Sequence, residues 1–136
     1  MSITSKVPMH ATLRPLGLAL LAALASPSFA EQRDDAMLKL ATTSGCFACH
    51  HVDPGATGPG GMAPIGPAWR DVARKYQGVP GAAQSLTRTV MGGSNPYASH
   101  WKDQVSGLAM PPNAVAIREA DAASLVQWIL QLAPAQ

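Results

Sequence analysis

The chain has 136 residues, with ten Lys or Arg against eight Asp or Glu and a formal net charge of +2. The surplus comes from Lys6 and Arg14, so residues 31–136 carry eight charges of each sign. A balanced chain without a basic cluster excludes nucleic acid as the expected partner. The length is enough for one compact domain.

The first thirty residues have the pattern of a secretory signal peptide. A weakly basic start precedes an apolar stretch from Leu16 to Ala25, and residues 28–30, Ser-Phe-Ala, have the small-x-small form of a signal peptidase site. The stretch is shorter than the roughly 20 residues of a membrane-spanning helix. We therefore predict cleavage after Ala30, a mature domain of residues 31–136 in the periplasm, and no integral membrane span once the leader is removed. Retention as an uncleaved anchor is the alternative.

The first helix of the mature part is expected to begin at Asp34 and Asp35 and to end at Gly45. The two carboxylates stand where the helix dipole favours negative charge. An apolar stripe at i, i+3, i+4 spacing starts at Met37.

This helix leads into residues 46–50, Cys-Phe-Ala-Cys-His, which contain both cysteines of the chain. Cys-x-x-Cys-His is the attachment pattern of a c-type haem. Each thiol adds across a porphyrin vinyl group, and the histidine reaches the iron from the same face. The motif predicts Cys46 and Cys49 as the covalent attachment points of one haem c, and His50 as an axial iron ligand. Export alone would favour a disulfide, but the histidine directly after the second thiol favours haem.

The rest of the chain is predicted to be helical, with long loops. Three further helices are expected, over residues 68–76, 82–91 and 118–132. The Gly- and Pro-rich segment 52–67 and the aperiodic segment 94–112 are predicted to be loops, although Trp101 and Leu108 indicate that parts of the second loop are packed. Strand-like alternation never extends beyond a few residues, so the fold class is all-α.

The second axial position decides what such a haem does. A methionine or a second histidine makes a six-coordinate electron carrier, whereas an open position allows gas binding or catalysis. Met110 is the preferred ligand because Pro111 and Pro112 stiffen the backbone that must hold a weak thioether ligand. The other candidates are less well placed, in core-like helical positions, in a flexible loop or beside His50: Met37, Met91, Met62, His51 and His100.

Three motifs in this order resemble the class I mono-haem cytochromes c of the short bacterial kind, the cytochrome c-551/c-552-like proteins. They are the haem motif, residues 66–76 and residues 110–113, and the resemblance covers residues 34–132. It implies four to five helices wrapping one covalent haem, with the first and last helices crossing. It also implies ligation by His50 and Met110, and one-electron transfer between redox partner proteins in the periplasm rather than enzymatic activity.

The resemblance assigns supporting roles to three residues. Pro67 matches a proline whose carbonyl accepts the Nδ1–H of the ligand histidine, which orients the ring. Asn113 matches an amide that hydrogen-bonds the ligand sulfur. Trp101 is the candidate for a tryptophan that meets a haem propionate, but it lies nine residues before Met110, farther than in the family. Pro67 is also a helix-starting proline, and Asn113 also fits a turn.

Other classes compete with a free electron carrier. The chain would also fit the haem c subunit of a periplasmic dehydrogenase complex, for example one for sulfite, or a haem enzyme or gas-binding protein with a displaceable ligand. A thiol–disulfide oxidoreductase places Cys-x-x-Cys on a βαβ scaffold that is absent here. A structural zinc site needs about four ligands, which the spare histidines are poorly spaced to supply.

Overall fold

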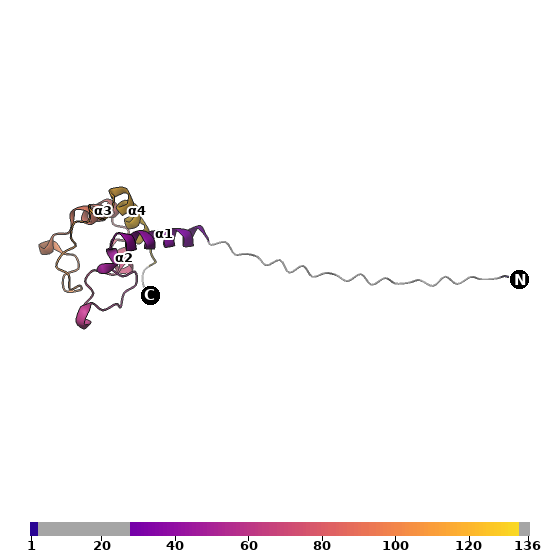
Figure 1. The fold of residues 1–136 in the computed structure, drawn as a ribbon, viewed down its shortest axis with the longest axis horizontal. Coiled ribbons are helices and arrows are strands. Elements are labelled where there is room, and N and C mark those ends of the chain that lie inside the picture. The colour runs from indigo at the N-terminus through magenta and orange to yellow at the C-terminus, as the bar shows by residue number, and fades with distance from the viewer. Residues whose placement is uncertain (3–27, 134–136) are drawn as a thin grey trace.

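The computed structural model describes residues 1–2 and 28–133, and this part of the chain is helical, without strands (Figure 1). The predicted all-α class is thereby confirmed. The leader prediction falls mostly on residues 3–27, outside the described part. Residues 28–133 contain four α-helices: α1 Phe29–Thr43, α2 Trp69–Tyr76, α3 Ala82–Gly92 and α4 Glu119–Ile129. In the same range, three short 3₁₀ helices interrupt the loops: η1 Cys46–Ala48, η2 Pro59–Gly61 and η3 Pro96–Ala98.

Helix α1 begins five residues before the predicted start at Asp34. The reason is a capping box: the Glu31 N–H donates to Ser28 Oγ at 3.3 Å, and the Ser28 N–H donates to Glu31 Oε2 at 2.9 Å. Asp34 therefore lies in the second turn rather than at the helix start. Its carboxylate is engaged elsewhere, with the indole of Trp128.

Helix α4 is the centre of the packing and contacts α1, α2 and α3 (Figure 1). Ala41 of α1 and Ala122 of α4 are completely buried, so small side chains let the two helices approach closely. The core cluster contains eight buried apolar residues: Ala41, Trp69, Val72, Ile117, Ala122, Leu125, Trp128 and Ile129. Within the described residues, no helix combines the length and apolar character needed to cross a bilayer.

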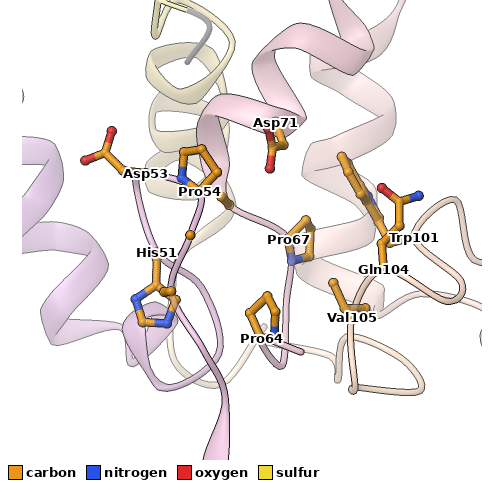
Figure 2. Close-up of a pocket in the computed structure, with 12 residues that line it drawn as sticks. His51, Asp53, Pro54, Pro64, Pro67, Asp71, Trp101, Gln104 and Val105 are labelled. Carbon is orange, nitrogen blue, oxygen red and sulfur yellow. The ribbon is translucent and has the colours of Figure 1, made fainter. Parts of the chain in front are cut away.

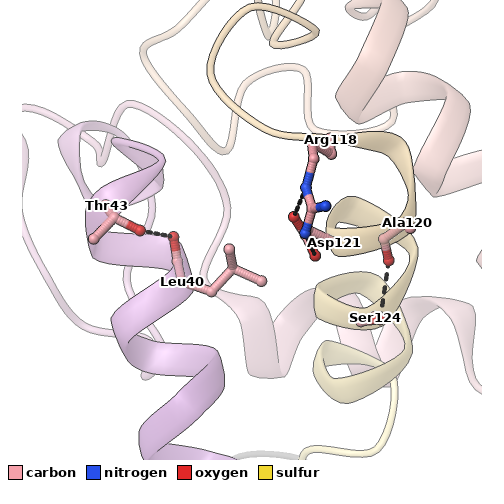
Figure 3. A network of polar contacts seen from close by, with 6 residues as sticks. All are labelled: Leu40, Thr43, Arg118, Ala120, Asp121 and Ser124. Carbon is pink, nitrogen blue, oxygen red and sulfur yellow. Dashed lines mark hydrogen bonds and ion pairs between the residues drawn. The ribbon is translucent and has the colours of Figure 1, made fainter.

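The start of α4 lacks a side-chain cap. Figure 3 shows Arg118 and Asp121 joined across the first turn instead, with Arg118 Nε 2.7 Å from Asp121 Oδ2, and Ser124 Oγ donating to the Ala120 carbonyl at 2.9 Å. The Thr43 hydroxyl donates similarly to the Leu40 carbonyl at the end of α1. Exposed i, i+3 ion pairs contribute little, so the buried apolar face of α4 holds this helix in place.

Candidate haem site

The cysteine motif folds into a single tight turn. Gly45, with φ +73°, ends the α1 region, and η1 follows directly. The N–H groups of Cys49 and His50 both donate to the Cys46 carbonyl, at 3.2 and 3.0 Å. These bonds place both thiols and the imidazole on one short turn of five residues. The cysteines are free and half-buried, and burial raises the pKa of the Cys46 thiol while a backbone hydrogen bond opposes it.

The His50 ring is oriented by the main chain of the next loop. Its Nδ1 lies 2.8 Å from the Pro67 carbonyl oxygen. A carbonyl can only accept, so Nδ1 carries the proton and Nε2 keeps its lone pair. Burial lowers the pKa of His50, the Pro67 hydrogen bond raises it, and the neighbouring His51 lowers it further. The neutral imidazole that results is the form that binds a metal.

Gly66 makes this contact sterically possible. It is buried, and its N–H donates to the Cys49 carbonyl at 2.8 Å. A Cβ at this position would lie 2.8 Å from His50 Cε1 and 2.9 Å from Nδ1. In the sequence Gly66 is the first residue of the second family motif, residues 66–76, and its close approach to the imidazole was not predicted.

The segment that carries Met110 is tied to the end of α3. The Met110 N–H donates to Ser94 Oγ at 2.8 Å, and the Ser94 N–H donates to the Met110 carbonyl at 2.9 Å. Gly93 adopts φ +83°, and a Cβ there would lie 3.0 Å from the Met110 carbonyl oxygen. Ser94 was missed in the sequence because nothing in its neighbourhood marks a partner sixteen residues away.

Asn113 adds a second tie between this segment and α3. Its side-chain amide donates to the Pro111 carbonyl at 2.6 Å and to the Val90 carbonyl at 3.3 Å. Its backbone N–H also donates to Val90, at 3.0 Å. These contacts match the turn role of Asn113, whose amide donates to one carbonyl of its own turn and to one of α3. The hydrogen bond from Asn113 to the Met110 sulfur stays a prediction.

The two loops of the site are joined to each other. The Ser106 N–H donates to the Pro64 carbonyl at 2.9 Å, and the Gly107 N–H donates to the Ile65 carbonyl at 3.0 Å. A Cβ on Gly107 would lie 2.5 Å from the Ile65 oxygen, so a larger residue would push the two loop segments apart. The segment leading to Met110 therefore runs against the segment leading to Gly66.

The alternative ligands occupy other environments. Met37 and Met91 pack against the core cluster, and Met62 lies in an exposed loop. His100 is exposed, with its Nδ1 2.6 Å from the Tyr76 hydroxyl. The positions of Met37, Met91 and Met62 match the core-like and loop interpretations that weighed against these residues.

Trp101 lines a surface cavity together with Pro67. Figure 2 shows it beside Gln104 and Val105, with His51 and Asp53 on the opposite side. The cavity has a volume of about 280 Å³, and Lys75 Nζ lies 5.1 Å from the centroid of the Trp101 ring. The contact between Trp101 and a haem propionate stays a prediction.

The expectation that Leu108 is packed is wrong, since its side chain is 84% exposed. The backbone hydrogen bond of the preceding Gly107 fixes this stretch without burying the leucine.

The residues of this site fit a covalently bound haem. Two free thiols and the oriented imidazole of His50 share one turn. The thioether of Met110 lies on a loop that is hydrogen-bonded to the loop holding the imidazole. Several apolar side chains on the motif and on α3 are only half-buried: Phe47, Leu86, Val90 and Met91. A zinc site is not supported, because no group of three or more His, Cys, Asp or Glu in residues 1–2 and 28–133 is arranged to hold a metal ion.

Comparisons with known proteins agree with this chemistry. The family model for cytochrome c matches residues 38–133. Cytochrome c-551 of Allochromatium vinosum is 40% identical over 95 residues, covering 70% of this chain and 84% of the relative. Cytochrome c-552 of Nitrosomonas europaea is 37% identical over 93 residues, covering 68% and 75%. The crystal structure of wild-type Nitrosomonas europaea cytochrome c552 superposes with a TM-score of 0.54 at 36% identity, covering 70% of this chain and 98% of that one. The chain therefore belongs to the cytochrome c family, as a class I mono-haem member that has one covalently bound c-type haem and acts in electron transfer rather than as an enzyme.

Proposed function

We propose that this protein is a periplasmic one-electron carrier whose haem is attached through Cys46 and Cys49 and ligated by His50 and Met110. The observation that carries the proposal is the 2.8 Å contact between His50 Nδ1 and the Pro67 carbonyl. It leaves Nε2 free to bind the iron, on the same short turn that carries both thiols. A metal-ligating histidine commonly donates its other ring N–H to a carbonyl in this way, whereas packing alone does not require such a hydrogen bond.

Met110 is the second ligand in this proposal because its backbone is fixed at both its N–H and its carbonyl by Ser94. A thioether is a weak donor, so the ligand loop must resist moving away from the iron. When bound, the haem supplies the exchange between ferrous and ferric iron. A soft thioether opposite an imidazole favours the ferrous state relative to two imidazoles. The chain itself holds, orients and shields the group.

We propose that redox partners dock through a small apolar surface beside the site, lined by Ala48, Met62 and residues 107–112. Met62 is 58% exposed and Leu108 is 84% exposed. They lie on the two loops that are joined by the backbone hydrogen bonds of Ser106 and Gly107. Contacts of this type bury less than about 1,200 Å² and form transiently. The charge balance of residues 31–136 predicts weak electrostatic steering.

The proposed location requires export, with cleavage after Ala30. Such a cut would leave Glu31 as the first residue. N-terminal sequencing of protein recovered from the periplasm of an expression host tests this site, and a chain beginning at Met1 would contradict it.

Ligation is tested by absorbance of the oxidised protein. Met110→Ala is expected to abolish the weak band at ~695 nm that reports a thioether on ferric iron, while Met62→Ala keeps it. Survival of the band in Met110→Ala would contradict the assignment. Intact mass of both variants should retain the ~616 Da of covalent haem, which separates loss of a ligand from loss of the cofactor.

A further inference from the structure

Residues 64–67 are hydrogen-bonded to the segments that carry both proposed iron ligands. On one side they hold the haem motif: the Gly66 N–H donates to the Cys49 carbonyl at 2.8 Å, and the Pro67 carbonyl accepts from His50 Nδ1 at 2.8 Å. Because Cys49 directly precedes His50, the histidine is held through its ring and through its neighbour in the chain. The position of the imidazole is therefore set relative to this short segment.

On the other side, the same residues hold the loop that leads to Met110. The Ser106 N–H donates to the Pro64 carbonyl at 2.9 Å, and the Gly107 N–H donates to the Ile65 carbonyl at 3.0 Å. We call these two hydrogen bonds the 64–107 bridge. Gly107 lies three residues before Met110. The bridge thus connects the Met110 loop directly to the segment that holds the imidazole.

The bridge leaves no room for a side chain at Gly107. A Cβ there would lie 2.5 Å from the Ile65 carbonyl oxygen and 3.2 Å from Ile65 Cγ2. Gly107 is half-buried and is not one of the glycines with positive φ. Its lack of a side chain is therefore explained by the close approach of the two segments and not by a left-handed backbone. Relief of the overlap needs a shift of roughly 1 Å, because ordinary contacts begin near 3.5 Å.

We propose that Gly107 is a positioning residue, which keeps Met110 on the iron by holding its loop against the segment that fixes His50. The inference rests on the proposed ligation by these two residues. A metal site requires its ligand distances to within about 0.2 Å. A shift of roughly 1 Å three residues before the thioether is therefore enough to weaken its bond. Ser94 also holds Met110, but Ser94 follows α3 and sets no distance to His50.

The bridge should therefore limit how fast an external ligand reaches the iron. Imidazole binds ferric iron only after Met110 has left it, so the binding rate at saturating imidazole measures that departure. Coupling between two sites is reciprocal in binding free energy. If the bridge retains Met110, replacement of Met110 by imidazole must in turn loosen the bridge. A packing contact without influence on ligation would show neither effect.

The first test mixes imidazole with the ferric holoproteins of wild type, Gly107→Ala and the control Gly92→Ala in a stopped-flow instrument. A Cβ at Gly92 meets nothing within 4 Å. Binding is expected to be at least tenfold faster in Gly107→Ala and unchanged in Gly92→Ala. The double variant Ile65→Leu/Gly107→Ala should bind as fast as Gly107→Ala, because the 2.5 Å overlap is with the main-chain oxygen and not with Cγ2. A wild-type rate in Gly107→Ala, or rescue by Ile65→Leu, would overturn the proposal.

The second test needs no variant and compares amide hydrogen exchange in the wild-type holoprotein with and without saturating imidazole. Exchange at Ser106 and Gly107 is expected to be several-fold faster with imidazole bound, whereas exchange at Gly66 should not change. Equal exchange at Gly107 in both states would overturn the proposal, even where Gly107→Ala does not fold.

The ~695 nm band of the wild type is recorded before either test. A band that is present, together with a negative result in these tests, would remove the role of the bridge and leave the proposed function standing. A band that is absent would remove the Met110 ligation on which both depend.

Discussion

The His50 side and the Met110 side of the site are supported by different kinds of groups. The His50 ring is held by a main-chain carbonyl, that of Pro67, and by the absence of a side chain at Gly66. The Met110 backbone is held by a hydroxyl, that of Ser94. The Pro67 carbonyl belongs to the main chain and remains whatever side chain stands at that position, whereas replacing Ser94 by alanine removes its hydroxyl. The His50 side should therefore be vulnerable to added volume, and the Met110 side to loss of a polar group.

The largest effect is expected on the His50 side, from Gly66→Ala. The new Cβ would lie 2.8 Å from the imidazole and 3.1 Å from the Cys49 carbonyl, both in a fixed turn. Overpacking of this kind costs about 1–3 kcal/mol, and we expect that loss in urea unfolding together with a lower yield of covalent haem. Gly92→Ala is the matched control, because a Cβ there meets nothing within 4 Å. Equal stability of the two variants would contradict the steric role of Gly66.

A smaller effect is expected on the Met110 side, from Ser94→Ala. It leaves the half-buried Met110 N–H without its 2.8 Å acceptor, a loss of about 1–2 kcal/mol. The ~695 nm band should then disappear at a lower temperature than global unfolding. Ser106→Ala is the control, since its hydroxyl makes only a 3.4 Å contact with the Pro64 carbonyl. A band in Ser94→Ala as heat-stable as in wild type would show that the hydroxyl does not restrain the ligand.

The smallest effect on stability is expected from Trp101→Phe, in the cavity that Trp101 and Pro67 both line. The ring stays over Lys75, so the change in the free energy of unfolding should remain below about 1 kcal/mol. Removal of the indole N–H should shift the reduction potential if that group meets a propionate. An unchanged potential would contradict the propionate contact that the family resemblance implies for Trp101.

Local patterns in the sequence were sufficient for much of this molecule. The all-α class and the haem itself follow from short motifs or helical periodicity. The prediction of Met110 as the second iron ligand also depended on neighbouring residues, Pro111 and Pro112. The absorbance spectrum of Met110→Ala tests it. Each of these signals is contained within a few neighbouring residues.

The parts that were missed depend on contacts between distant segments. Ser94 meets Met110 sixteen residues later, and Asp34 meets Trp128 ninety-four residues later. Asp34 looked like a helix-start carboxylate because that explanation needs no partner. The early start of α1 was missed for another reason: the capping box at Ser28 overlaps a stretch that also reads as a cleavage site.

If the proposed cleavage takes place, that overlap means that the precursor and the exported chain begin differently. Cleavage after Ala30 would remove Ser28 and put a new ammonium group on Glu31, at the N-terminal end of α1, where the peptide dipoles already concentrate positive charge. The first turn of the mature helix should then unwind, and the ordered helix should start close to where the Asp34 carboxylate is anchored on Trp128. Amide exchange at residues 31–33 is accordingly expected to be fast in the secreted protein and to slow sharply beyond that anchor.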